Sequence, residues 1–190
     1  MSQFRYFPTF PEHADLRDRP CVYCGRAPSI PGVRLNSGPE SSQPACADCL
    51  AIGKAAVKIP KWVITDLERA VSTTHPDWSV DRQATYVAER IDELAHTPPI
   101  PWLQNNEWPV CGDDFAVYEG ELTRENLEQR TGDLERAKDT LHSILSQTVP
   151  NWEQDAQALE GEWSELGNYL AIFAFQCSDS GEARYVVQTA

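Results

Sequence analysis

Cys21-Val-Tyr-Cys24-Gly25 and Cys46-Ala-Asp-Cys49 are the two stretches that decide the fold of the N-terminal part of this chain. A C-x-x-C loop directs both of its sulfurs to one side, so two such loops can supply a tetrahedral shell of four thiolates, which is a typical zinc site. Gly25 allows the positive φ that the turn after the first pair needs. The two pairs are separated by 21 residues, a gap that zinc ribbons and treble clefs tolerate. We therefore expect these four cysteines to hold one structural zinc ion.

Three other uses of the four cysteines compete with zinc. The start of the chain has no apolar signal segment, and no stretch approaches the roughly 20 apolar residues that span a bilayer. We therefore expect a cytoplasmic protein without a membrane segment, in a compartment where disulfides are rare. A redox pair needs a strand–helix setting, which the sequence around Cys21 lacks. An iron–sulfur cluster also takes four thiolates and stays open as an alternative.

Local patterns predict an α+β protein. Apolar residues recur at helical spacing over residues 80–95, with Ser79 as N-cap, and over residues 124–147, with Thr123 as N-cap. A shorter helix is expected over 62–71, further helical turns over 152–163 and a small hairpin near 33–35. The Pro-rich segment 97–115 is expected to lack regular structure. Residues 169–176 and 183–188 are rich in β-formers and flank a turn-like insert, which predicts a C-terminal β-hairpin.

These elements suggest two regions that pack as one unit. Residues 1–60 would form an N-terminal strap and a treble-clef-like zinc module with four cysteine ligands, in which the second cysteine pair opens a helix. Residues 61–190 would form the central helices and the C-terminal hairpin.

The formal net charge of −13 is unevenly distributed along the chain. Residues 1–62 carry five acids and eight bases, whereas residues 113–165 carry fourteen acids and only four bases. A negative field repels phosphate backbones and attracts cationic partners, although acidic helices can also serve solubility alone. If a cationic partner binds, we expect it on the acidic helix, at Glu125, Glu128, Asp133, Glu135 and Asp139.

The remaining cysteines and the histidines show no metal-ligand spacing. Cys111 and Cys177 are each expected to be buried apolar residues, because a second metal site would need two more ligands from the nearby aspartates or from distant histidines. The aspartates in question are Asp113, Asp114 and Asp179, and the histidines are His13, His75, His96 and His142.

Several short stretches in this order along nearly the whole chain resemble those of the bacterial CbrC family. They are Phe4-Arg-Tyr-Phe-Pro, the two cysteine pairs with Leu-Ala-Ile-Gly-Lys-Ala-Ala after the second, Thr97-Pro, Trp102-Leu-Gln, Trp108, Cys111-Gly-Asp and Tyr169-Leu-Ala-Ile-Phe-Ala-Phe-Gln-Cys177. The resemblance implies a protein linked to tolerance of a nuclease colicin, or an immunity protein encoded beside a toxin gene. The implied partner is a basic, nuclease-like bacterial toxin.

The chain departs from the pattern of that family at three positions. Ser180 stands where the family closes with a second cysteine before Gly181, Val110 where it has a histidine, and Phe115 where it has another cysteine. If the family builds a second metal site there, the resemblance implies that this chain has lost it. The acidic insert around residues 123–165 is also longer than the resemblance leads us to expect.

Three functions follow from these observations. An interaction protein that neutralises a toxin fits the negative charge. An enzyme is less favoured, because Asp113 and Asp114 beside Cys111 hint at acid–base chemistry but no nucleophile–base pair is recognisable. The net charge opposes a nucleic-acid role for the zinc module, although the N-terminal third is basic. Its bases include Arg5, Arg17, Arg19, Arg26 and Arg34.

Overall fold

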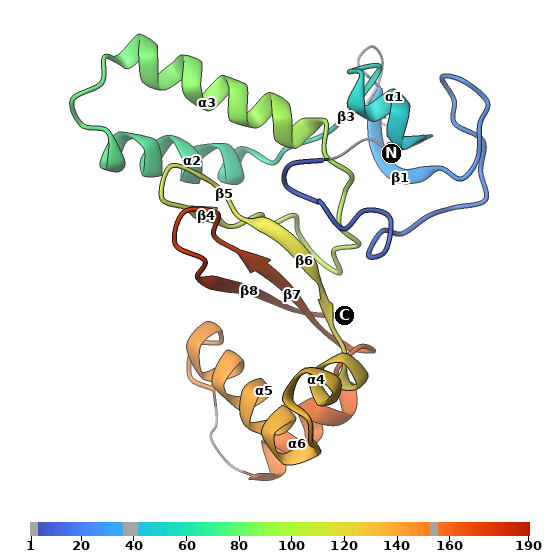
Figure 1. The fold of residues 1–190 in the computed structure, drawn as a ribbon, viewed down its shortest axis with the longest axis vertical. Helices are drawn as coiled ribbons and strands as arrows, with labels where there is room; N and C mark the ends of the chain where they lie inside the picture. Colours follow the sequence, from blue (N-terminus) through green and yellow to red (C-terminus); the bar gives the residue numbers. More distant parts are fainter. Residues whose placement is uncertain (1–3, 36–41, 153–155) are drawn as a thin grey trace.

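The computed structural model describes residues 4–35, 42–152 and 156–190 of the chain. A three-stranded antiparallel sheet lies at the middle of an elongated molecule (Figure 1). The cysteine module and a pair of helices lie at one end of it, and three further helices lie at the other. The protein is therefore α+β, as the sequence predicts.

The cysteine module has the treble-clef-like order of knuckle, hairpin, knuckle and helix. Strands β1 (Ile30–Leu35) and β2 (Ser42–Ala45) pair antiparallel, and helix α1 (Ala47–Ala51) follows directly from the second knuckle. The hairpin expected near residues 33–35 is thus present, although its tip at 36–41 lies outside the described residues. Strand β3 (Ala55–Val57) adds to the other side of β1, where the sequence offered only an Ala-rich stretch.

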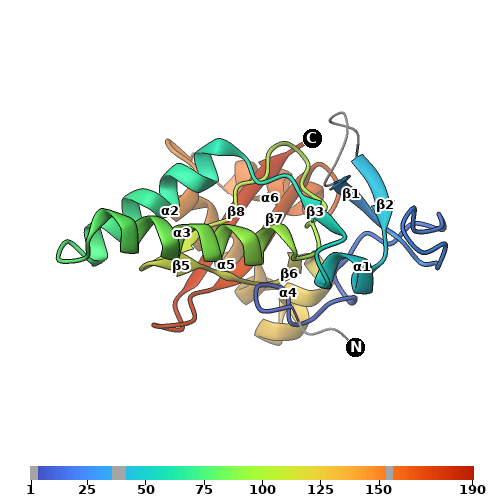
Figure 2. The same ribbon diagram turned by 90° about the horizontal axis from the view of Figure 1, so that it is seen from above.

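Helices α2 (Lys61–Thr74) and α3 (Val80–Ala95) form the long antiparallel pair seen from above in Figure 2. The bounds of α3 are those predicted from its apolar period. Ser79 caps it as expected, since its hydroxyl accepts a hydrogen bond from the Arg82 amide at 3.3 Å. The buried side chains of α2, Val63, Leu67 and Val71, follow the i, i+4 spacing of one helix face.

The central sheet has the strand order β6-β7-β8. Strands β7 (Leu170–Gln176) and β8 (Ala183–Thr189) are the predicted C-terminal hairpin, and β6 (Val117–Leu122) is a third strand that the sequence did not predict. The ladder of β6 is irregular between Tyr118 and Gly120. Gly120 has φ +132°, which L side chains rarely adopt, and a Cβ atom there would lie 2.9 Å from the His13 ring, so both the backbone and the close approach of the N-terminal strap favour glycine here.

Strand β7 is buried on both faces and separates two hydrophobic clusters. Phe173 and Phe175 face the larger cluster, which also contains Cys21, Cys46 and Cys49 of the cysteine module. Leu170, Ile172 and Ala174 face the smaller cluster, which the three helices at the other end of the molecule complete. Because side chains alternate along a strand, one apolar strand ties both halves of the molecule together.

The single helix predicted over residues 124–147 is wrong. The structure has two helices there, α4 (Arg124–Thr131) and α5 (Leu134–Thr148), with Gly132 between them at φ +89°. A left-handed glycine ends α4, and the Asp133 side chain then caps α5 by accepting from the Arg136 amide at 2.9 Å. The predicted Thr123 cap is confirmed, as part of a capping box with Asn126.

Helix α6 (Ala156–Glu165) corresponds to the helical turns expected over 152–163. Residues 153–155 of that stretch lie outside the described residues. Segment 97–115 also contains two short paired strands, β4 (Val110–Cys111) and β5 (Asp114–Phe115), where no regular structure was expected. Among the described helices, none has both the length and the apolar character that crossing a bilayer requires.

Candidate metal centre

The first knuckle is a tight turn around Cys21 and Cys24. The Gly25 amide donates to the Cys21 carbonyl at 2.8 Å, and the Cys21 amide donates to the Arg26 carbonyl at 2.8 Å. Gly25 has φ +71°, which is the conformation that the sequence predicts for it. This turn aims the amides of Tyr23 and Cys24 at the Cys21 sulfur.

The second knuckle is held beside the first. Cys46 is the N-cap residue of α1, and its amide points at the Cys21 sulfur, while the Cys49 amide points at the Cys46 sulfur. A backbone hydrogen bond of 3.0 Å from the Val22 amide to the Pro44 carbonyl joins the two knuckles directly. As the sequence predicts, the helix start therefore supplies N–H groups to the thiols.

The four sulfurs converge on one point. All of them lie within 4.8 Å of one another, and the Sγ atoms of Cys24 and Cys46 are 3.5 Å apart. A tetrahedral shell with metal–sulfur bonds of about 2.3 Å places its sulfurs about 3.8 Å apart. The cluster is therefore of the right size to hold a metal ion, with Cys21, Cys24, Cys46 and Cys49 as ligands.

The surroundings of the cluster are apolar on one side and polar on the other. Cys21, Cys46 and Cys49 are buried, whereas Cys24 is exposed beside Arg26. Burial, together with the neighbouring thiols, raises the pKa of Cys49 to about 12, while hydrogen bonds from Arg26 lower the pKa of Cys24 to about 6. The Arg26 guanidinium also pairs with Asp48 at 2.9 Å, so it bridges the two knuckles. A shared cation would favour the thiolate form at all four positions.

A protein-family model matches residues 1–189, which is nearly the entire chain. The chain belongs to the uncharacterised protein family UPF0167. No curated protein and no solved structure matches it.

In this UPF0167 protein, the expectation that Cys111 and Cys177 are two separate buried thiols is wrong. Instead of two separate thiols, the structure has a disulfide that joins β4 to the end of β7, across 66 residues of sequence. The turn after Cys177 repeats the first knuckle, since the Gly181 amide donates to the Cys177 carbonyl at 2.9 Å and the Cys177 amide to the Glu182 carbonyl at 2.8 Å. Gly181 has φ +70°, close to that of Gly25. Ser180 stands in this turn where the first knuckle has Cys24.

The aspartates beside Cys111 make contacts to other side chains. Asp113 pairs with His75 at 2.6 Å, and the His75 ring stacks on Trp78 with 3.7 Å between ring centres. Asp114 accepts a hydrogen bond of 2.6 Å from the Tyr6 hydroxyl.

Asp114 also pairs with Arg5, and so does Glu93 of α3, at 3.0 Å. This network joins the N-terminal strap, α3 and β5. The sequence gives no signal for it, since its members are distant from one another along the chain.

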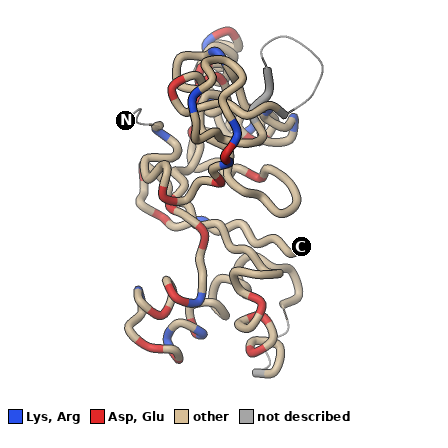
Figure 3. Tube along the Cα trace, turned by 90° about the vertical axis from the view of Figure 1, so that its right-hand side faces the viewer, with Lys and Arg blue, Asp and Glu red and all other residues tan. Residues whose placement is uncertain are grey.

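The five acidic positions proposed as a contact face are all exposed but lie on two helices. Glu125 and Glu128 are on α4, whereas Asp133, Glu135 and Asp139 cap or belong to α5. The same helices also carry four basic residues, Arg124, Arg130, Arg136 and Lys138. In the part of the molecule that these helices form, Lys and Arg positions lie among the Asp and Glu positions (Figure 3). These helices are therefore much less negative than residues 113–165 as a whole.

Three of the five arginines that make the N-terminal third basic are paired with acids. Arg17 pairs with Asp15 at 2.5 Å, and Arg5 and Arg26 have the partners given above. The side chain of Arg34 lies outside the described residues. These pairs reduce the positive potential that a phosphate backbone would meet.

Proposed function

We propose that the four-cysteine cluster binds zinc and that the metal is structural. The observation that carries this proposal is the convergence of four sulfurs from two knuckles within 4.8 Å. Four protein ligands close a tetrahedral shell and leave no position for water or substrate, which is typical of structural zinc. An iron–sulfur cluster uses the same number of thiolates and is the competing occupant.

The metal would stabilise a module that has little regular structure of its own. Its helix α1 has five residues and its strands have three to six. Since three of the ligands belong to the larger hydrophobic cluster, metal binding would also fix the packing of the strap and of α3.

Metal content tests the zinc proposal. Untagged protein, purified without added metal, should contain one equivalent of zinc and show no visible absorption. A brown protein with iron and acid-labile sulfide would instead support the cluster. Protein without either metal would remove the proposal.

We further propose that the protein is an interaction module that binds a cationic protein, such as a nuclease-like toxin. Two observations support this: the net charge of −13 and the resemblance to the CbrC family. Complementary potentials speed association and reject partners of like charge. The protein would then confer tolerance or immunity by occupying the toxin.

Co-expression tests the interaction. A toxin encoded next to this gene should form a complex with the protein that survives gel filtration, and cells that express both should grow. If no complex forms and growth is not restored, the interaction proposal is wrong, whatever the metal content.

A further inference from the structure

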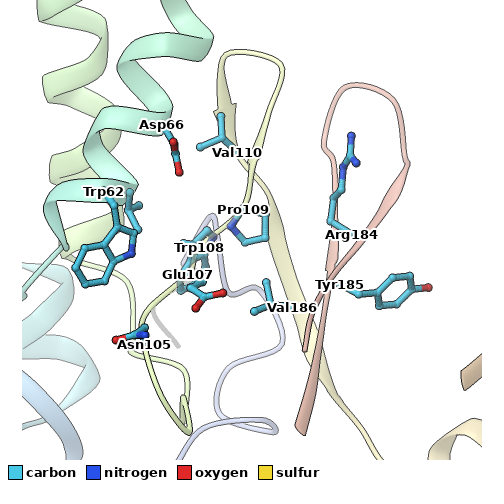
Figure 4. Close-up of a pocket in the computed structure, with 11 residues that line it drawn as sticks. Trp62, Asp66, Asn105, Glu107, Trp108, Pro109, Val110, Arg184, Tyr185 and Val186 are labelled. Carbon is cyan, nitrogen blue, oxygen red and sulfur yellow. The ribbon is translucent and has the colours of Figure 1, made fainter. Parts of the chain in front are cut away.

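A groove of about 580 Å³ lies between helix α2 and strand β8, with residues 105–110 between them (Figure 4). Trp62 and Asp66 contribute from α2, and Arg184, Tyr185 and Val186 contribute from β8. The volume is within the range of about 300–1,000 Å³ that is common for ligand sites. No sequence pattern predicts this groove, because its walls come from segments far apart along the chain.

The groove combines an aromatic ring with two carboxylates. Trp62 is 51% exposed, and its indole N–H donates to the Asn106 carbonyl at 3.0 Å, which fixes the ring. Asp66 follows one helical turn later on the same face of α2, and Glu107 comes from the loop. Glu107 has no ion-pair partner among the described residues. An aromatic ring beside carboxylates is a typical environment for an ammonium or guanidinium group.

The one basic side chain among the residues that line the groove is already paired. Arg184 contacts Glu182 at 3.1 Å, at the end of the hairpin. Asp66 contacts Arg69 at 3.1 Å, so Glu107 is the lining carboxylate without an ion-pair partner among the described residues, in a protein that is itself strongly negative. This charge favours a cationic occupant.

The loop beside the groove is held in place by Gln188, whose side chain is buried. Its Oε1 atom accepts from the Leu103 and Gln104 amides at 3.0 and 3.1 Å, and its Nε2 atom donates to the Asn105 carbonyl at 2.7 Å. Trp108 donates to the Ala116 carbonyl at 2.8 Å. A site whose walls are already fixed loses less entropy when it binds.

Strand β8 also offers backbone groups along its outer edge. The Cys177 amide bonds to the Glu182 carbonyl at one end of the hairpin, and the Ala190 amide bonds to the Tyr169 carbonyl at the other. The alternation of an antiparallel ladder therefore directs the N–H and C=O groups of Tyr185 and Val187 away from β7. Within the described part of the chain these groups have no partner, so an extended segment can pair with them.

We propose that this groove binds an arginine or lysine side chain of a protein partner, carried on an extended segment that adds to the edge of β8. The basic side chain would lie against Trp62 and between the carboxylates of Asp66 and Glu107. This inference rests on the proposed function, because it specifies where the cationic protein docks.

Peptide titration of the metal-loaded, ¹⁵N-labelled full chain tests the groove without a toxin. The probe is acetyl-Val-Arg-Val-amide, and its neutral match is acetyl-Val-Gln-Val-amide. The arginine peptide should shift the Trp62 indole signal, assigned with Trp62→Phe, and the amide signals of Tyr185 and Val187. The glutamine peptide should bind about tenfold more weakly, as expected for the loss of two partly exposed charge contacts.

Two matched double variants separate the groove from general charge. Asp66→Asn/Glu107→Gln should weaken binding of the arginine peptide about tenfold. Asp77→Asn/Glu89→Gln removes the same charge from exposed positions outside the groove and should leave binding unchanged. Equal loss in both variants, equal binding of both peptides, or no shift at Trp62 would overturn the groove proposal.

The same variants distinguish this inference from the proposed function. If a toxin binds the wild type and the groove variant equally well, the groove is wrong while the interaction function stands. If the peptide binds in the groove but no toxin complex forms, the toxin-binding function is wrong.

Discussion

Replacing Asp114 with alanine removes the carboxylate that joins the N-terminal strap to β5. This carboxylate accepts hydrogen bonds from the Tyr6 hydroxyl at 2.6 Å and from the Phe115 amide at 2.8 Å. Tyr6 is fully buried, so its hydroxyl would be left without a partner, at a cost of about 1–3 kcal/mol. The ion pair with the partly exposed Arg5 adds less than about 1 kcal/mol. We expect Asp114→Ala to lower the free energy of unfolding by about 2–4 kcal/mol.

Urea denaturation of metal-loaded protein, followed by far-UV circular dichroism, measures this loss. Asp114→Asn keeps an acceptor for the Tyr6 hydroxyl and should cost only about 1 kcal/mol. Glu89→Ala changes an exposed acid on α3 and should stay within about 0.5 kcal/mol of wild type. If Asp114→Ala behaves like Glu89→Ala, or if Asp114→Asn is as destabilising as Asp114→Ala, the bond between Asp114 and the Tyr6 hydroxyl does not stabilise the fold in this way.

Four further variants test other parts of the fold, each by its effect on the free energy of unfolding. Gly132→Ala should destabilise the fold by about 1 kcal/mol, because the φ of residue 132 is +89°. Gly161→Ala, inside α6, should stabilise it by about 0.5–1 kcal/mol. A change of the same sign in both variants would contradict the helix break at Gly132. Burial raises the pKa of Glu121, so its charge destabilises the fold at neutral pH. Glu121→Gln should therefore be more stable there, with an advantage that disappears below the ordinary glutamate pKa of about 4.3; a pH-independent difference would argue against this. Cys111→Ala/Cys177→Ala opens a 66-residue loop and should cost up to about 4 kcal/mol, and an unchanged urea midpoint would show that the bond is absent in solution.

The sequence was informative where local chemistry decides the structure. The cysteine spacing predicted the two knuckles, and Ser79 with its apolar period predicted both ends of α3. The β-formers around the insert at 177–182 predicted the hairpin of β7 and β8. In each case the residues that determine the element lie within or next to it.

The predictions failed where distant contacts decide the structure. Strand β6 contains Gly120 and two glutamates, so its composition is poor for a strand, and the packing of His13 against that glycine is invisible in sequence. Gly132 lies in a stretch with continuous helical period, so the break depended on one left-handed residue. Cys111 and Cys177 meet only because β4 and β7 end at the same place. The groove of Trp62 likewise needs α2 and β8, which are far apart along the chain.

Metal analysis of two cysteine variants is the most direct test of the proposed four-thiolate zinc centre. The wild type should contain one zinc per chain and lose it with Cys49→Ser, whose parent thiol lies inside the four-sulfur cluster. Cys177→Ser, outside the cluster, should keep its full zinc content. Wild-type protein free of metal, or zinc that remains bound after Cys49→Ser, would contradict a four-thiolate centre.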